Sequence, residues 1–278
     1  MLADVLPYLR CPLCRLELVE LETAVRCPQG HSFDRAKQGY VFLTATPVRH
    51  TGDSAQMVDA RAGFLAAGHY DFIARAVAGA TPPTDGLVVD VGAGTGYHLA
   101  AVLDTNREAV GLAVDVSKPA LRRAARAHPR VGAVLGDTWR GLPVADQAAS
   151  VLLNVFAPRN GPEFARVLAP GGLLIVVTPT GDHMGELVSA LGLLTVDPAK
   201  EERVAATLAP WFVERTSEVC EKPLLLSRAE VVGLIGMGPN AWHLDPGELS
   251  ARIAPLPEPV AVTARVRLSS YSQVPLGS

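Results

Sequence analysis

The sequence lacks any apolar run long enough to cross a lipid bilayer. Its longest apolar stretch, 172–178, has the length of a strand, whereas a membrane helix needs about 20 apolar residues. The first ten residues do not show the basic segment and apolar stretch of a secretory signal. We therefore expect a cytoplasmic protein that does not contact a membrane.

Cysteine and lysine are both scarce. The four cysteines in 278 residues exclude the disulfide framework of a small secreted domain. Three lie within the first 27 residues, whereas Cys220 stands alone and is expected to be a small buried hydrophobe. The net charge of −3 does not indicate a nucleic-acid binder. It does not exclude one, because phosphate contact needs only a local basic patch.

The chain divides into three regions. Residues 1–43 hold the cysteine cluster and short, turn-rich segments. Residues 44–84 form a connector with a helix over 56–65, closed by the rigid prolines Pro82 and Pro83. Residues 85–278 alternate strand-like and helix-like segments.

The third region predicts a mostly parallel sheet covered by helices on both faces. Continuous apolar strands are expected over 87–91, 110–116, 131–135, 149–156 and 173–177, the last one preceded by a chain break at Gly171 and Gly172. Helices are expected over 95–103, 117–127, 161–168, 184–191, 199–208 and 228–236. The segments 212–221 and 260–268 alternate in polarity like an antiparallel pair at the edge of the sheet.

A glycine-rich loop carries the sharpest signal of this region. Asp90 lies near the end of the first strand, and Gly92, Gly94 and Gly96 follow before a helix begins. Glycines there let the backbone turn tightly and let a ligand approach without interference from Cβ atoms. Dinucleotide enzymes use G-x-G-x-x-G at this place, so the loop alone is a weak indicator. The spacing G-x-G-x-G after an acidic residue resembles the first motif of class I S-adenosylmethionine methyltransferases.

Polar side chains also end the next three strands. Asp115 lies about 20 residues beyond the loop, where a carboxylate can accept both ribose hydroxyls. Asp137 follows the third strand, where the resemblance places a residue against the adenine amino group. Asn154 and Phe156 end the fourth strand, where the resemblance implies that they lie beside the transferred methyl group, although core packing explains Phe156 equally well. Capping of a helix or turn is the alternative role for each aspartate. Because Asp90, Asp115 and Asp137 lie at successive strand ends, however, cofactor binding is favoured.

The N-terminal cysteines have the spacing of a zinc site. Cys11 and Cys14 form C-x2-C, and Cys27 and His31 form C-x3-H after a gap of 12 residues. Two close pairs separated by such a loop are what tetrahedral Zn²⁺ requires. A redox pair is the alternative for a lone C-x-x-C, but the second pair argues against it. Four protein ligands leave no open position, so the zinc is expected to be structural.

Together these motifs resemble the 23S rRNA guanine-N1 methyltransferases, including the tylosin-resistance type. The resemblance covers nearly the whole chain and rests on the cysteine motifs and on Ala36-Lys37-Gln38-Gly39-Tyr40-Val41, Gly52-Asp53-Ser54, Met57, Ala60-Arg61, Phe64-Leu65, Gly68-His69-Tyr70-Asp71, Asp115-Val116-Ser117-Lys118, Ala157-Pro158, Pro170-Gly171-Gly172, Thr178-Pro179, His183 and Glu186-Leu187. It implies a seven-stranded Rossmann-like methyltransferase domain with a small N-terminal zinc module, and methyl transfer to N1 of one guanine in a domain II hairpin. It also implies a role in macrolide resistance and a homodimer.

The resemblance and the motifs give a set of site residues. The cofactor residues are expected to be Asp90, Gly92, Gly94, Gly96, Tyr97, His98, Asp115, Asp137, Asn154 and His183. Removal of the N1 proton of guanine needs a base or an orienting group, for which the candidates are His69, His98, Asp182 and His183. Packing beside the methionine end is the alternative for His69 and His98, and helix capping is the alternative for Asp182.

Basic residues that could contact RNA form two clusters. One lies in or near the zinc module: Arg10, Arg15, Arg26, Arg35, Lys37 and Arg49. The other lies on the helix after the second strand: Lys118, Arg122, Arg123, Arg126 and Arg130. A solvated helix face is the favoured interpretation of the second cluster. Tyr40 and Phe42 could stack on bases, but we expect them to be core residues of the module.

Three other functions compete with rRNA methylation. A small-molecule methyltransferase could use the zinc module as a lid, and the negative net charge mildly favours it. A non-enzymatic S-adenosylmethionine sensor is disfavoured because the cofactor loop is intact. A nicotinamide enzyme would require G-x-G-x-x-G and a small residue where this chain has Tyr97.

Overall fold

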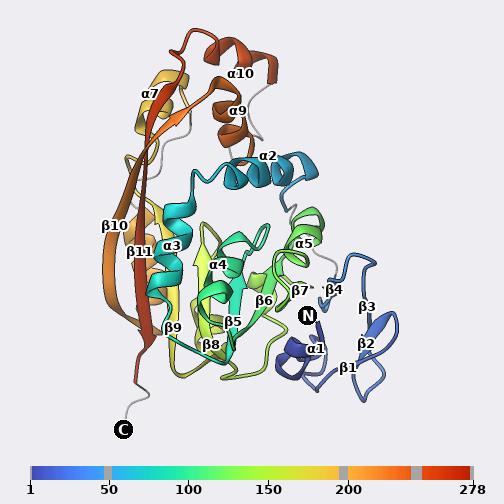
Figure 1. Ribbon diagram of the computed structural model, residues 1–278. Helices are drawn as coiled ribbons and strands as arrows, with labels where there is room; N and C mark the ends of the chain where they lie inside the picture. Colours follow the sequence, from blue (N-terminus) through green and yellow to red (C-terminus); the bar gives the residue numbers. More distant parts are fainter. Residues whose placement is uncertain (1, 47–51, 194–199, 239–245, 276–278) are drawn as a thin grey trace.

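The computed structural model describes residues 2–46, 52–193, 200–238 and 246–275 (Figure 1). The N-terminal region starts with α1 (Leu2–Val5) and the 3-10 helix η1 (Leu6–Tyr8). An antiparallel sheet of β1 (Val19–Glu20), β2 (Ala24–Arg26) and β3 (Ser32–Asp34) follows. No helix among the described residues has the length and apolar character needed to span a membrane.

The connector holds two helices where the sequence predicted one. The expected helix is α2 (Ala55–Ala66), whose N-terminus is capped by Ser54 accepting a bond from the Met57 N–H at 3.2 Å. The unpredicted helix is α3 (Asp71–Ala80), which buries an apolar stripe that includes Ile73 and Val77. It ends at Thr81, directly before the two prolines.

The large sheet has the order β10-β11-β9-β8-β5-β6-β7-β4. Its strands are β4 (Val41–Phe42), β5 (Leu87–Val91), β6 (Val110–Asp115), β7 (Val131–Leu135), β8 (Ala149–Val155), β9 (Leu168–Pro179), β10 (Phe212–Leu226) and β11 (Val260–Gln273). The strands β4 to β9 pair in parallel and β11 pairs antiparallel with β9 and β10. This confirms the predicted fold class, including the antiparallel pair.

The sheet differs from the sequence-based expectation in two places. It has an eighth strand, because β4 of the N-terminal region pairs with β7 and covers an edge that would otherwise be open. The predicted break at Gly171 and Gly172 is wrong, because β9 runs through both glycines. The register of its pairing with β8 shifts at this point, and Gly171 has a φ of 77°, a conformation that suits a glycine at such a bulge.

Helices cover both faces of the sheet. They are α4 (Tyr97–Thr105), α5 (Lys118–Ala124), α6 (Gly161–Val167), α7 (Gly185–Leu191), α8 (Lys200–Leu208), α9 (Arg228–Gly236) and α10 (Pro246–Ile253), with a 3-10 turn η2 (Thr138–Arg140) after β7. The sequence did not predict α10. Figure 1 shows α2 across the upper end of the sheet, beneath α9 and α10, and the zinc module beside β7.

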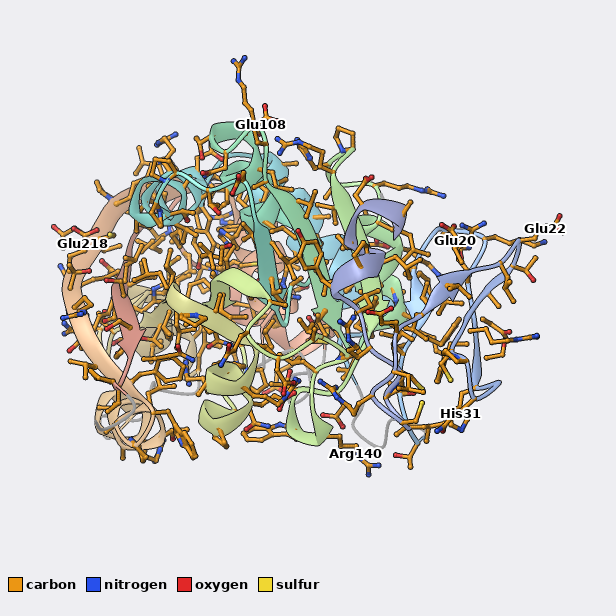
Figure 2. All side chains as sticks on the ribbon, turned by 90° about the horizontal axis from the view of Figure 1, so that it is seen from below. Glu20, Glu22, His31, Glu108, Arg140 and Glu218 are labelled. Carbon is orange, nitrogen blue, oxygen red and sulfur yellow. The ribbon has the colours of Figure 1, made fainter. Side chains whose placement is uncertain are left out.

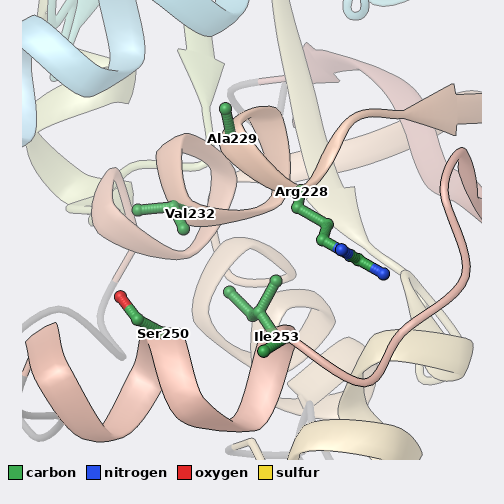
Figure 3. A pocket seen from close by; sticks show the side chains of 6 residues that line it. Arg228, Ala229, Val232, Ser250 and Ile253 are labelled. Carbon is green, nitrogen blue, oxygen red and sulfur yellow. The ribbon is translucent and has the colours of Figure 1, made fainter.

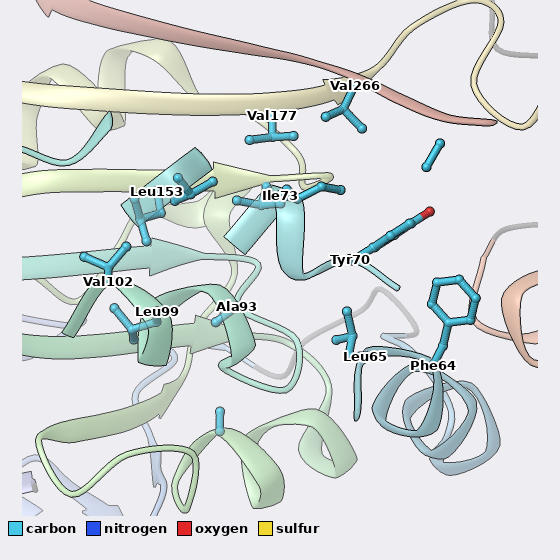
Figure 4. Close-up of a cluster of buried hydrophobic side chains, with 14 of the residues drawn as sticks. Phe64, Leu65, Tyr70, Ile73, Ala93, Leu99, Val102, Leu153, Val177 and Val266 are labelled. Carbon is cyan, nitrogen blue, oxygen red and sulfur yellow. The ribbon is translucent and has the colours of Figure 1, made fainter. Parts of the chain in front are cut away.

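Alternating strand residues divide the core into two layers. Val88 and Ala113 face the layer that contains α2, α3, α4 and α9, part of which Figure 4 shows. Val89 and Leu112 face the opposite layer, which contains α1, α6 and the apolar residues of the zinc module. The module is therefore a continuation of the domain core. Cys220, expected to be buried, is only partly buried on β10.

A hollow of about 290 Å³ lies between α9 and α10 (Figure 3). Its lining is mostly apolar, and its charged residue, Arg228, already donates to the Leu256 carbonyl. None of the residues that line this hollow belongs to the glycine loop, and we assign the hollow no part in the chemistry.

Candidate cofactor and zinc sites

The glycine loop joins β5 to α4 in a conformation that favours glycine at three positions. Gly92, Gly94 and Gly96 have φ values of 76°, 55° and 77°. A Cβ atom at Gly92 would lie 2.5 Å from the Cβ of Ala157, and one at Gly96 would lie 3.1 Å from the Cα of Ala124. Such close approach leaves the backbone of the loop bare at the carboxyl end of the sheet, where open α/β sheets bind ligands.

Two carboxylates stand behind this loop. Asp115 accepts the Gly94 N–H at 2.8 Å through Oδ2 and the Ser117 N–H at 2.7 Å through Oδ1. Asp90 is 2% exposed, and burial together with the neighbouring Asp115 raises its pKa to about 7. Burial also raises the pKa of Asp115. A ligand that brings hydroxyls and positive charge, such as a ribose and an ammonium group, would offset both effects.

The next two predicted residues are held by local bonds. Asp137 is buried and accepts the Trp139 N–H at 3.0 Å, so it caps η2. A cap was the alternative to a cofactor contact for this residue. Asn154 is fully buried and donates to the Pro158 carbonyl at 2.8 Å. Among the described residues the Asn154 Oδ1 and the Asp137 Oδ2 have no hydrogen-bond partner, although Arg140 lies 3.5 Å from the latter. Contact of either residue with the cofactor stays a prediction.

Tyr97 and His98 lie at the start of α4, and Tyr97 contacts the connector. The Tyr97 hydroxyl donates to the Asp71 carboxylate at the start of α3. Burial, with a smaller contribution from Arg61, lowers the pKa of His98 to about 4. A neutral imidazole there is suited to packing against a ligand and poorly suited to accepting a substrate proton at neutral pH.

Two of the four predicted bases are engaged elsewhere. His69 lies with its Nε2 2.8 Å from Glu230 of α9, and its ring packs against Phe64 at 4.7 Å between centroids. Asp182 accepts the Thr180 hydroxyl at 2.7 Å and pairs with Arg265. Those bonds lower the pKa of Asp182, so its carboxylate is a weak proton acceptor.

His183 lies in an aromatic cluster at the ends of β8 and β9. Its Nε2 is 3.2 Å from the hydroxyl of the buried Tyr70, and its Nδ1 is 2.8 Å from the Arg265 carbonyl. The Arg265 N–H also lies 3.2 Å from Nδ1, so these contacts are compatible with either tautomer of the ring. Phe156 lies 6.2 Å from Tyr70 and 6.3 Å from His183 between ring centroids, and it is 42% exposed. Figure 4 shows the Tyr70 hydroxyl directed away from the core.

The four predicted zinc ligands converge. The ligand atoms of Cys11, Cys14, Cys27 and His31 all lie within 4.8 Å of one another. The Cys14 and Cys27 sulfurs are 3.6 Å apart, and the His31 Nδ1 is 3.3 Å from Cys27 and 3.5 Å from Cys11. These separations fit four ligands around one Zn²⁺, given Zn–S bonds of about 2.3 Å and Zn–N bonds of about 2.0 Å.

Comparisons with known proteins match the two regions that hold these sites. Residues 9–52 match the zinc ribbon described as the RlmA N-terminal region, and residues 88–172 match a methyltransferase domain. A protein of Streptomyces fradiae named 23S rRNA (guanine(748)-N1)-methyltransferase is 48% identical over 98% of this chain and 99% of its own length. A protein of Micromonospora griseorubida with the provisional name 23S rRNA (guanine-N1-)-methyltransferase is 56% identical over the same shares.

The chain belongs to the 23S rRNA (guanine-N1)-methyltransferase family. It is therefore an S-adenosylmethionine-dependent methyltransferase with a structural zinc ribbon, as predicted. A solved chain from the complex between the Haloferax volcanii Trm112 methyltransferase activator and a methyltransferase supports the fold alone. It has a TM-score of 0.52 and 17% identity over 80% of this chain and 98% of its own.

The basic residues of this family member are only partly available for RNA. Arg10, Arg15 and Arg35 donate to backbone carbonyls of the protein, and Arg130 binds three carbonyls around Asn106. Arg49 lies outside the described residues. The exposed residues of the two clusters include Arg26, Lys37, Arg122 and Arg126. Figure 2 shows His31 and Glu20 on the zinc ribbon at one end of the molecule.

The two basic clusters adjoin one another. The Lys118 ammonium lies over the Phe42 ring at 5.2 Å, and the turn at Gly39 lies close to Ala125, the residue that follows α5. Tyr40 is 2% exposed and Phe42 is half-buried. Both are packing residues, but they pack in the layer that contains α4 and α5, not with the apolar residues of the module as expected. Sequence reasoning treated the clusters as separate because it could not foresee that β4 carries the ribbon onto the sheet.

Two residues near the site were noticed in the sequence only as family motif positions. Tyr70 supplies the hydroxyl on His183, and Arg61 lies above the glycine loop. A third, Trp139, was not noticed at all; it is 58% exposed beside Asp137. An aromatic side chain so exposed directly after a strand end is the signal that could have found it.

Proposed function

We propose that this protein transfers a methyl group to N1 of a single guanine in a domain II hairpin of 23S rRNA. The Streptomyces fradiae relative is named for guanine 748, and its 48% identity over both full chains supports the same target here. Protection of ribosomes against macrolides such as tylosin follows from that target. We further propose that the protein acts in the cytoplasm as a homodimer. Residues 1–43 would hold the RNA, residues 44–84 would form a connector, and residues 85–278 would form the catalytic domain.

The chemistry requires positioning more than covalent help from the protein. S-adenosylmethionine, when bound, supplies an electrophilic methyl group on a sulfonium, and the nucleophile must approach in line with it. The bare glycine loop and Asp115 would hold the cofactor. Phe156, which is 42% exposed after the end of β8, would stack on the target guanine.

The N1 proton needs an acceptor, and of the four candidates His183 is the best placed. The Arg265 backbone holds its Nδ1. In the tautomer with hydrogen on Nδ1, which the proposal requires, the lone pair of Nε2 faces the Tyr70 hydroxyl. As N1 bonds to the methyl group, its proton passes to the Tyr70 oxygen while the Tyr70 proton passes to Nε2. The imidazolium that forms then releases its proton to water. His69, His98 and Asp182 lack such an arrangement.

The observation that carries the proposal is the combination of the zinc ribbon with an intact cofactor loop in one chain. The test is to incubate the protein with labelled S-adenosylmethionine and the unmodified domain II hairpin, then to map reverse-transcription stops. We expect one strong stop, because a methyl group on N1 blocks Watson–Crick pairing. A hairpin with adenine at that position is the control and should give no stop.

A protein that binds S-adenosylhomocysteine but labels neither the hairpin nor whole 23S rRNA would overturn the rRNA assignment and leave a small-molecule substrate. The role of His183 is tested separately with His183→Ala and Tyr70→Phe. The first should lower kcat roughly 100-fold or more, the range for a general base. His128→Gln is the matched control. His128 follows α5 and pairs with Asp104 of α4, so this variant should leave kcat unchanged.

A further inference from the structure

A single arginine of the connector lies directly above the glycine loop. A Cβ atom built on Gly94 would lie 3.5 Å from Nη1 and 3.9 Å from Cδ of Arg61. Arg61 belongs to α2, which is remote in sequence from the loop and lies across the end of the sheet in Figure 1. The guanidinium is thus presented to the backbone of the loop that is predicted to hold the cofactor.

The contacts of Arg61 hold it there and leave donors free. Nη1 pairs with the Asp53 carboxylate, and Nη2 donates to the Met237 carbonyl at 2.8 Å, just beyond the end of α9. The Asp53 carbonyl in turn accepts the Ser117 hydroxyl at 2.7 Å. A guanidinium has five N–H donors, and these two bonds do not use them all. The side chain is 26% exposed, so it is neither buried in the core nor free in solvent.

The charges around Arg61 are mixed. The positive charge of Arg61 lowers the pKa of His98 and opposes the upward shift in the pKa of Asp115. Asp53 and Asp115 are the acidic groups nearby, and His98 on α4 is neutral at pH 7. The site therefore offers carboxylates for hydroxyl and ammonium groups, and one fixed cation for an anion. The anionic group of S-adenosylmethionine is its α-carboxylate.

We propose that Arg61 binds the α-carboxylate of the methionyl end of S-adenosylmethionine. This inference rests on the cofactor assignment and extends the proposed function to a residue that selects the amino-acid end of the ligand. Planar guanidinium groups suit carboxylates because two N–H bonds can form in parallel. Asp115, which accepts the Gly94 N–H, remains for the ribose.

The competing explanation is structural. Arg61 could act only as a strut that ties the loop before α2 to α9 through Asp53 and Met237. The two explanations differ in one respect. A strut affects every adenosine ligand equally, whereas a carboxylate-binding residue affects only ligands that carry the carboxylate.

The experiment measures the affinities of S-adenosylhomocysteine and of its decarboxylated form, S-adenosyl-3-thiopropylamine, by titration calorimetry. In the unmodified protein the decarboxylated ligand should bind roughly 10- to 100-fold more weakly, the usual value of a charge-assisted bond. In Arg61→Met the two ligands should bind with affinities within about threefold of each other. Arg61→Lys should fall between, because lysine keeps the charge but not the paired donors.

The matched control is Arg123→Met. Arg123 pairs with Asp59 of α2 at 2.5 Å, so this variant also removes an ion pair to the same helix without touching the loop. It should keep the full discrimination between the ligands. If Arg61→Met weakens both ligands equally, or weakens neither, Arg61 is a strut and the proposal is wrong. Failure of the unmodified protein to bind S-adenosylhomocysteine would instead contradict the cofactor assignment itself.

Discussion

Gly92 of the glycine loop lies so close to Ala157, just beyond the end of β8, that a Cβ atom on Gly92 would be 2.5 Å from the Cβ of Ala157. Gly92 also has a φ of 76°, which side chains other than glycine rarely adopt. We expect Gly92→Ala to destabilise the fold by about 1–3 kcal/mol and to weaken S-adenosylhomocysteine binding, because both strain and overlap displace the loop. Urea unfolding and calorimetry measure the two effects.

A second substitution separates the causes. Ala157→Gly added to Gly92→Ala relieves the overlap but not the backbone strain, so it should restore part of the lost stability. Gly79→Ala is the control. Gly79 lies in α3 with open space at its Cβ position, so this change should be neutral or stabilising by about 0.4–1 kcal/mol. A Gly92→Ala protein as stable as the unmodified one would contradict the steric argument.

Zinc removal should affect the whole domain. Cys11 and Cys27 belong to the same core layer as Val89 and Leu112 of the sheet. We expect Cys27→Ser or a strong chelator to remove about one zinc per chain and to lower the melting temperature by roughly 10 °C or more. Cys220→Ser is the control and should keep the metal, because Cys220 lies on β10 away from the ribbon. An unchanged melting temperature after metal loss would show that the ribbon does not support the sheet.

The buried carboxylate of Asp90 should make stability depend on pH. Its pKa rises on folding from an ordinary value of 3.8 to about 7, so the folded state binds the extra proton between these values. Stability contributed by the protonated group is present at low pH and falls as pH rises toward 7, with a slope approaching about 1.4 kcal/mol per unit. Asp90→Asn should remove this slope. Denaturant unfolding of both ligand-free proteins between pH 4.5 and 8 measures the difference, and equal slopes would contradict the prediction.

Arg122 of α5 and Arg126, two residues beyond the end of α5, are exposed beside the ribbon and should contact RNA phosphates. Replacing both with Gln should weaken hairpin binding and reduce the dependence of log K on log salt by roughly 1 for each lost contact. Cofactor affinity should not change. Arg215 is exposed on β10, at the opposite edge of the sheet from β4, and Arg215→Gln is the control. An equal effect of the control would assign the loss to net charge rather than to this face.

Several features of this protein are written in short stretches of its sequence. The zinc ligands lie within 21 consecutive residues, and their spacing alone predicted the cluster that the structure contains. The glycine loop and the apolar strands were equally predictable, because backbone conformation at glycines and strand periodicity are local properties. The capped helix α9 was predicted over its full length, Arg228–Gly236, because its signals are adjacent in the chain.

The tertiary structure alone decided which distant residues meet. Arg61 reaches Gly94 and Met237, and Tyr70 reaches His183, across separations in the chain that no local pattern encodes. Packing also decided which arginines donate to backbone carbonyls and which stay exposed, and it added β4 to the edge of the sheet. These outcomes depend on how the connector and the ribbon bury their apolar faces, because burial is non-directional and its partners are fixed only in the assembled fold.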